Sequence, residues 1–202
     1  MIRASLLAAA GLSLLVLPAA AKPKPKPKAD AAPPSLQASP VGTFGDWNVF
    51  AAGEGKARIC YAISQPQVRL PKSLKRDPAY LFVTVRKGEK VNNEVAVMLG
   101  FAPKPGSGQA TTTAAANGAV PAPASSASDP SLAIGSARYA LVVKGANAWV
   151  QNPADESKVV AEMGRGKKVV IKAVSQRGNA STDEYALDGF GEAMKRTREE
   201  CK

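Results

Sequence analysis

Ile59-Cys60-Tyr61-Ala62-Ile63 alternates large and small side chains with a period of two. Successive side chains of a β-strand point to opposite faces of the sheet. Ile59, Tyr61 and Ile63 therefore share one face, and Cys60 shares the other with Ala62. The small residues on that second face leave room for a helix to approach closely. The segment predicts a strand that carries one of the two cysteines of the chain.

The same period of two recurs on both sides of this segment, with turn residues such as Lys87-Gly88 and Lys144-Gly145 between the repeats. Many short alternating segments joined by turns are typical of a mainly β fold, either an antiparallel β-sandwich or a partly closed barrel. Further strands are expected at residues 81–85, 95–99, 139–143, 148–150 and 169–173 and around Tyr185, whereas residues 159–163 fit either a strand or a short helix.

The last segment of the chain follows the helical period instead. At 100° per residue, charged side chains gather on one side, and the apolar stripe collects Phe190, Ala193, Met194, Thr197 and Cys201. This pattern predicts an amphipathic C-terminal α-helix packed on the sheet. Because Cys60 lies on a strand face that a helix can approach, the two cysteines are predicted to lock the helix to that strand as a disulfide.

The first residues predict export. Arg3 precedes an apolar run at residues 6–17, and Ala19-Ala20-Ala21 offers the small residues that a signal peptidase requires. The run is too short to cross a bilayer as an anchor. Residues 1–21 are therefore predicted to be a signal peptide, with no transmembrane segment in the mature chain. Export places the mature chain in the periplasm, associated with the outer membrane or secreted, where two cysteines favour a disulfide over free thiols.

A Lys/Pro-rich linker is predicted at residues 22–42. Proline at alternate positions fixes φ and removes backbone donors, which favours an extended polyproline II conformation. This basic arm fits a contact with an anionic envelope surface and fits a solubilising linker equally well. Its alternating lysines are Lys22, Lys24, Lys26 and Lys28.

A single β-rich domain is predicted at residues 43–202, with one interruption. Residues 103–131 are rich in Ala, Thr, Ser, Gly and Pro and show no apolar periodicity. Such a composition cannot bury a core, so a disordered insertion in one surface loop is expected there. The halves on either side are each too small to fold well alone.

The charge and composition of the 202-residue chain limit its partners and its chemistry. With 27 basic and 16 acidic residues the net charge is +11, which favours anionic partners. Nucleic acid is not expected, because the chain is predicted to be exported and lacks basic motifs interleaved with aromatic residues. Besides the arm, Lys72, Lys75 and Arg76 fit a second basic patch with Arg165, Lys167 and Lys168, and these residues also fit a merely solvated exterior.

Enzyme chemistry finds little support in the sequence. The absence of histidine excludes Ser-His-Asp and Cys-His catalysis and His-ligated zinc, so no cofactor and no metal are expected. Asp183 and Glu184 are adjacent on a predicted strand, so their side chains point to opposite faces and cannot flank one glycosidic bond. Trp47 and Trp149 could form a sugar-stacking platform, but their alternating surroundings favour packing in the core.

Several short motifs follow one another along the chain, namely Phe44-Gly45-Asp46-Trp47, Cys60-Tyr61-Ala62, Arg76-Asp77-Pro78-Ala79-Tyr80, Asn93-Glu94-Val95, Ala148-Trp149, Arg177-Gly178 and Thr182-Asp183-Glu184-Tyr185-Ala186-Leu187-Asp188-Gly189-Phe190, with Cys201 last. Their ordered combination resembles the invasion-associated locus B family of exported Gram-negative bacterial proteins. The resemblance covers residue 41 to the C-terminus except the insertion, and it implies a periplasmic or envelope location and a role in host-cell invasion. It supplies no set of catalytic residues. The motif residues to which we assign a structural role are Phe44, Gly45, Asp46, Trp47, Arg76, Asp77, Tyr80, Trp149, Asp183 and Tyr185.

The leading hypothesis is therefore a non-enzymatic envelope protein that binds an envelope or host partner, through either an anionic component or a protein. One alternative is a His-free periplasmic hydrolase of envelope polysaccharide, which requires two acids facing each other across a groove. The other is a periplasmic chaperone or inhibitor, which requires an exposed apolar patch or sheet edge.

Overall fold

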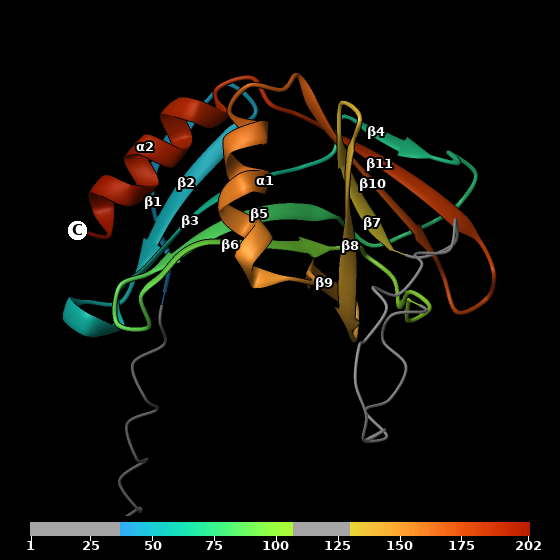
Figure 1. Ribbon diagram of the computed structural model, residues 1–202, viewed down its shortest axis with the longest axis horizontal. Helices are drawn as coiled ribbons and strands as arrows, with labels where there is room; N and C mark the ends of the chain where they lie inside the picture. Colours follow the sequence, from blue (N-terminus) through green and yellow to red (C-terminus); the bar gives the residue numbers. More distant parts are fainter. Residues whose placement is uncertain (1–36, 107–129) are drawn as a thin grey trace, which may run out of the picture. The chain divides into compact units, whose positions relative to one another are not determined.

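The computed structural model describes residues 37–106 and 130–202 (Figure 1). All of these belong to one compact unit. The predicted signal peptide, the basic arm with Lys22, Lys24, Lys26 and Lys28, and residues 107–129 of the predicted insertion lie outside the described residues.

One open antiparallel sheet of eleven strands forms the fold, as the alternation predicted, and its strand order is β1-β2-β3-β5-β6-β9-β8-β7-β10-β11-β4. The strands are β1 (Ser39–Phe44), β2 (Trp47–Ala52), β3 (Ile59–Ser64), β4 (Val68–Leu70), β5 (Tyr80–Arg86), β6 (Val91–Met98), β7 (Ser131–Ile134), β8 (Ala137–Lys144), β9 (Asn147–Val150), β10 (Lys168–Val174) and β11 (Ala180–Ala186). The helices are α1 (Glu156–Met163) and α2 (Phe190–Glu200), with 3-10 turns at Gly55–Ala57 and Pro153–Asp155.

The sheet curls until its two ends come close together without closing. Strand β8 forms the bend, because its first half pairs with β7 and its second half pairs with β9. The Trp47 indole Nε1 at the start of β2 donates to the Ala186 carbonyl at the end of β11, over 3.1 Å. The edge strands β1 and β4 remain unpaired with each other, so the sheet is not closed.

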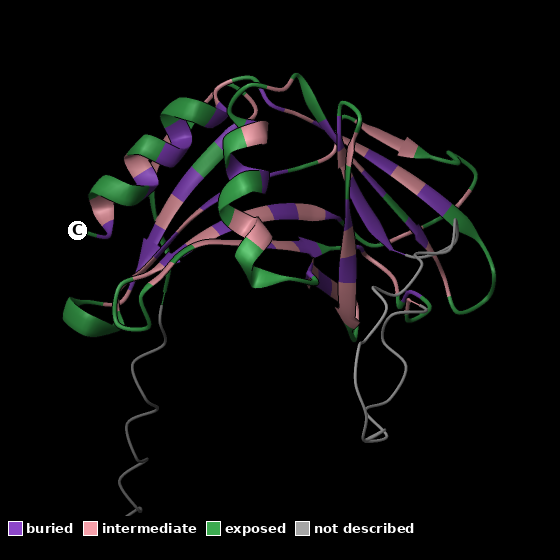
Figure 2. Cartoon of the chain, in the orientation of Figure 1, coloured by how far each residue is buried: buried purple, intermediate pink, exposed green. Residues whose placement is uncertain are grey.

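The inner face of the curled sheet holds the hydrophobic core. In β5, for example, Leu81 and Val83 are fully buried, whereas Phe82 and Thr84 between them are half-buried on the outer face. Figure 2 shows this alternation along the strands. Helix α1 packs on β6, and α2 packs on β1, β2, β3 and β5 (Figure 1). Both helices bury their apolar residues in the same core as the strands.

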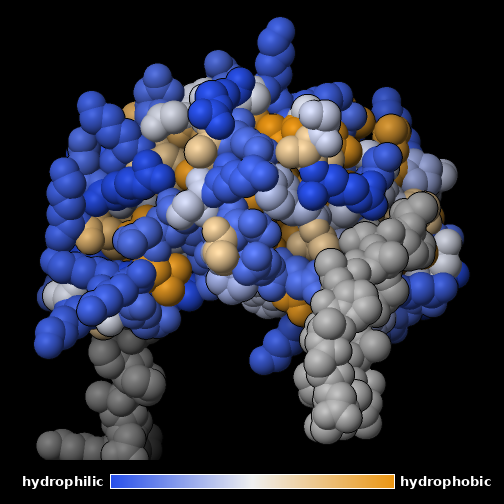
Figure 3. All heavy atoms as spheres, viewed as in Figure 1, coloured by the Kyte–Doolittle hydropathy of each residue, from blue (hydrophilic) through white to orange (hydrophobic). Residues whose placement is uncertain are grey.

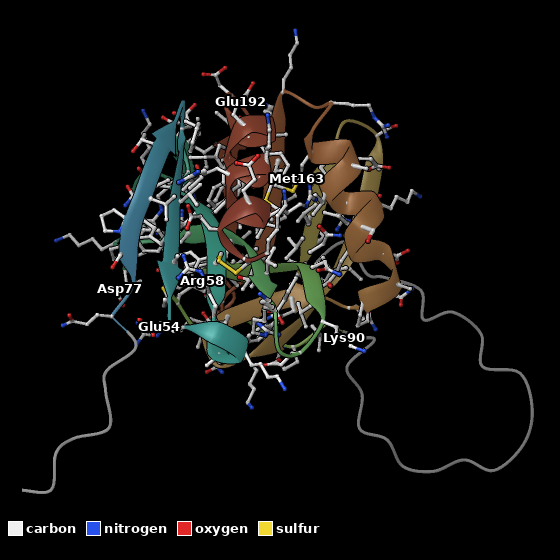
Figure 4. The ribbon with its side chains drawn as sticks, turned by 90° about the vertical axis from the view of Figure 1, so that its left-hand side faces the viewer. Glu54, Arg58, Asp77, Lys90, Met163 and Glu192 are labelled. Carbon is white, nitrogen blue, oxygen red and sulfur yellow. A yellow bond between two sulfur atoms is a disulfide. The ribbon has the colours of Figure 1, made fainter. Side chains whose placement is uncertain are left out.

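The disulfide between Cys60 and Cys201 joins β3 to the end of α2, as the two periodicities predicted. The helix buries the predicted stripe, with Phe190, Met194 and Thr197 at most 2% exposed. Arg58 secures the same end of the helix, because its Nε donates to the Glu200 carbonyl over 2.6 Å and its Nη2 lies 2.7 Å from Glu200 Oε2. Figure 4 shows the disulfide next to Arg58.

Residues 159–163, which fitted a strand or a helix, belong to helix α1. Val159, Val160 and Met163 bury one face of this helix in the core. The Glu156 carboxylate accepts from the backbone N–H of Val95 over 3.3 Å, which ties the first turn of α1 to β6. The site is partly buried, and that desolvation raises the pKa of Glu156 above its ordinary value despite the hydrogen bond.

Four strands were not predicted by alternation, namely β1, β2, β4 and β7. Strand β1 begins at Ser39, within the predicted linker and before the predicted domain start at residue 43. Both ends of the predicted insertion also belong to the folded structure, because Pro103 bridges to Ser175 and Ser131 begins β7. Strands β4 and β7 are short and β1 lies at a sheet edge, so few residues establish a period there. Strand β2 is an interior strand, and the four consecutive apolar residues at 49–52 obscure its period.

Candidate functional site

Two of the recognised motifs, residues 44–47 and 188–190, interlock at the start of α2. The backbone N–H of Asp46 donates to the Asp188 carbonyl over 3.2 Å. The rings of Trp47 and Phe190 meet edge to face, with 4.8 Å between their centroids. Gly189 has a φ of +77°, and a Cβ placed there would collide with the Phe44 carbonyl. The residues around Trp47 therefore hold the start of α2 against the turn between β1 and β2.

Gly189→Ala is expected to lower the free energy of unfolding by about 1–3 kcal/mol, because alanine at a positive φ is strained and its Cβ meets backbone. The matched control is Gly191→Ala, two residues further on, where a Cβ meets nothing within 4 Å. Alanine there is expected to stabilise the helix by about 0.5–1 kcal/mol. Urea unfolding of the two variants checks the opposite signs, and equal effects would contradict this account of the motif.

Arg76 and Asp183 form a buried two-point ion pair inside the curled sheet. The Arg76 Nη2 and Nη1 atoms lie 2.7 and 2.9 Å from the two carboxylate oxygens, and the side chains are 6% and 1% exposed. Arg69 Nε lies 3.9 Å from the same carboxylate. Burial, followed by the charge of Asp183, raises the pKa of the Tyr185 hydroxyl far above its ordinary value, so this phenol stays neutral.

The predicted acids do not form a catalytic pair. Asp183 points inward to Arg76. Its neighbour Glu184 forms an ion pair on the outer face, with 2.8 Å between Glu184 Oε2 and Lys168 Nζ. The two carboxylates therefore lie on opposite faces of β11, as the alternation predicted. Asp77 is exposed, and its backbone N–H donates to the Gly100 carbonyl over 3.1 Å. Its contacts fix the loop before β5.

The predicted basic patch is only partly surface-exposed. Arg165, Lys167 and Lys168 are exposed in and beside the turn between α1 and β10. Arg76 was predicted to join this surface, and that prediction is wrong because its guanidinium is buried against Asp183 and stacks 5.7 Å from the Phe101 ring centroid.

The outer face of the sheet carries a continuous row of apolar side chains that we call the outer row. Cross-strand register places its members side by side on β3, β5, β6, β9 and β8. All of them are half-buried and none belongs to the core. The members of the outer row are, in order, Ile63, Phe82, Ala96, Trp149 and Val142.

Both tryptophans were expected to pack in the core, and the prediction is correct for Trp47 and wrong for Trp149. Trp47 is fully buried in the core, as expected. Trp149 lies on the outer row instead, because the inward positions of β9 are those of its neighbours Ala148 and Val150. One Trp thus packs in the core, and the other belongs to the surface.

Aromatic side chains extend the outer row along the strands. The ring of Tyr61 lies 6.0 Å from that of Phe82 and stacks on Phe50 at 5.5 Å with an interplanar angle of 19°. Tyr80 lies 6.1 Å from Phe82, and its cross-strand partner Met98 is 37% exposed. Partial burial among these side chains raises the pKa of Tyr61 above its ordinary value. The face drawn in Figure 3, over the two helices, is by contrast covered mainly by hydrophilic side chains.

Within residues 37–106 and 130–202, no three potential metal-binding side chains of the His, Cys, Asp and Glu types gather at one point. No helix in these same ranges has the length and apolar character needed to span a membrane. No family model, curated protein or solved structure matches the chain.

Proposed function

We propose that the protein is an exported, non-enzymatic binding protein of the cell envelope that holds a protein partner on the outer row. The single observation that supports this function is the apolar and aromatic surface centred on Phe82 and Trp149. Both described helices pack on the opposite face of the sheet. Contiguous apolar surface of this kind commonly marks an interaction site. Export and the role in invasion rest on the sequence and on the family resemblance.

The residue composition of the outer row and the charged residue beside it both fit a protein partner. Tyr, Trp, Phe and Met are the residue types enriched in protein interfaces. Beside the Val142 end of the outer row, the exposed cation Lys144 lies two residues further along the same face of β8. The matching partner surface has an apolar centre bordered by a carboxylate on one side, which supplies orientation and faster association.

The alternatives differ in how much support they receive. A chaperone or inhibitor is a special form of the proposed function, because it also requires an exposed apolar surface for a protein. A hydrolase has less support, because Asp183 is engaged by Arg76 and its neighbour Glu184 lies on the other face. Binding of an anionic envelope component through Lys22, Lys24, Lys26 and Lys28 stays a prediction from the sequence.

Site-specific photo-crosslinking in the source bacterium tests this proposal. A photoreactive phenylalanine analogue replaces Phe82 or Trp149 in the full-length chain, and the matched control replaces Thr182, which is half-buried on the outer face of β11 outside the outer row. Crosslinked protein is expected from the first two positions and not from the third. Trp149→Ala is expected to weaken binding of the isolated partner at least tenfold, because aromatic anchors dominate such interfaces.

Three results would refute this proposal: equal crosslinking at Thr182, no crosslinked protein at Phe82 or Trp149, or unchanged affinity of Trp149→Ala. Circular dichroism and urea unfolding of each variant confirm that the sheet is intact. The outer-face substitutions are expected to leave the free energy of unfolding within about 1 kcal/mol of the parent, because these side chains are not part of the core.

A further inference from the structure

A recess of about 400 Å³ opens on the outer face beside the turn between β1 and β2. It has a different chemical character from the outer row. Two aromatic rings and an aliphatic floor formed by Ile63 meet four polar side chains that carry carboxylate or amide groups. The principal lining residues are Asp46, Asn48, Phe50, Gln65, Gln67 and Tyr80.

Hydrogen bonds orient three of the four polar side chains of this recess. Gln67 Nε2 donates to Asp46 Oδ1 over 2.8 Å, and the Gln67 backbone N–H donates to the Glu184 carbonyl over 2.8 Å. Thr43 Oγ1 donates to Asn48 Oδ1 over 2.7 Å. Among the described side chains, the Asn48 amide N–H₂ and the second oxygen of Asp46 have no further partner. The recess therefore presents both donors and acceptors in fixed positions.

The two aromatic rings are also fixed. Phe50 is stacked on Tyr61, and Tyr80 packs against Phe82. Each ring belongs to a strand, β2 for Phe50 and β5 for Tyr80, with β3 between them. Binding groups placed on strands keep their geometry better than groups on loops, and rings that are already ordered lose little entropy when a ligand packs on them.

The charge of the recess narrows the class of ligand. The chain has 27 lysine and arginine residues, yet none of them lines the recess, and its one ionisable acid is Asp46. A carboxylate without a nearby cation disfavours anionic ligands. The ligand is therefore neutral, with one apolar face for an aromatic ring and several groups that both donate and accept hydrogen bonds.

We infer that this recess is a binding site for a neutral sugar unit of a glycan. The axial C–H groups of a pyranose form an apolar face that packs on an aromatic ring, and its hydroxyl groups match the amides and the carboxylate. A volume of about 400 Å³ accommodates one or two sugar residues. This site adjoins the outer row, because Ile63 belongs to both, whereas its polar residues lie outside the outer row.

Isothermal titration of the mature, disulfide-bonded protein with three tetrasaccharides tests the inference. The probes are maltotetraose and the tetramer of N-acetylglucosamine, which are neutral, and tetragalacturonate, which is anionic. At least one neutral probe is expected to bind, and the anionic probe is expected to bind at least tenfold more weakly. Asn48→Ala is expected to weaken neutral binding about tenfold through loss of the oriented amide.

The matched control is Asn179→Ala, which removes an exposed amide from the turn between β10 and β11 and is expected to leave binding unchanged. Asp46→Asn is expected to raise the affinity for tetragalacturonate by removing the repelling charge. The inference is wrong if neither neutral probe binds, if the anionic probe binds as well as the neutral ones, or if Asn48→Ala has no effect. Crosslinking at Phe82 and Trp149 is unaffected by these results, so the two proposals fail separately.

Discussion

Replacing both Cys60 and Cys201 by alanine is expected to lower the free energy of unfolding by about 4–5 kcal/mol. The two cysteines are 141 residues apart in the sequence, so the disulfide closes a loop that includes most of the fold. Closing so long a loop removes much of the conformational entropy of the unfolded chain, which is the main reason for the stabilisation. Urea unfolding of the double variant beside the parent measures the difference.

Helix α2 is expected to remain on the sheet in that double variant. Phe190, Ala193 and Met194 are buried in the main core and do not depend on the disulfide for their packing. Circular dichroism should therefore be close to that of the parent below the unfolding transition. The parent treated with a reductant is a matched control, because it loses the same covalent link without a change in sequence. A loss below about 1 kcal/mol in both samples would contradict a stabilising role for this disulfide.

The strand and the helix that carry this disulfide could be predicted because each shows its period over enough residues. Alternation in Ile59–Ser64 assigns Cys60 to the face of small residues that a helix can approach, and the helical stripe assigns Cys201 to the apolar side of α2. Each assignment requires only local geometry. Because both assignments fit one contact between this strand and this helix, the pairing of Cys60 with Cys201 could be predicted from the sequence.

The outer row could not be predicted in the same way. Alternation assigned Phe82 and Trp149 to faces of their own strands, but it does not say which face is covered when both carry apolar residues. In β5, for example, Leu81 and Phe82 are both large and apolar, and only the curl of the sheet around the core makes one inner and the other outer. Apolar residues on both faces of a strand remain a usable signal that one face is an exposed apolar surface.

The ion pair of Arg76 with Asp183 could not be predicted from local sequence patterns either, because the two residues are 107 positions apart. Residues 76–78 have the local pattern of a turn before a strand, and it is the curl of the sheet that brings this turn to β11. Periodicity contains no information about which strands become neighbours, so the burial of this arginine follows from topology alone. The prediction that Asp183 faces away from Glu184 needed only the strand geometry, and it is correct.

Asp183→Asn is expected to lower the free energy of unfolding by about 3–5 kcal/mol, because it leaves the charge of Arg76 buried without a counterion. Its neighbour supplies the matched control. Glu184→Gln makes the same chemical change on the same strand, but it removes a partly exposed ion pair with Lys168, for which about 0–1 kcal/mol is expected. Urea unfolding of the two variants compares the loss of a buried carboxylate with the loss of a partly exposed one at neighbouring positions of the same strand.

A third variant distinguishes the effect of an unpaired buried charge from the effect of losing the ion pair itself. Arg76→Met combined with Asp183→Leu removes both charges and fills the space with apolar side chains, so its stability is expected to lie well above that of Asp183→Asn. Arg69, 3.9 Å from the same carboxylate, remains in all three proteins and limits the recovery, because it loses its partner as well. If Asp183→Asn were no less stable than Glu184→Gln, the buried pair would not be what holds the loop before β5 to β11, and the contact between these two motifs would need another cause.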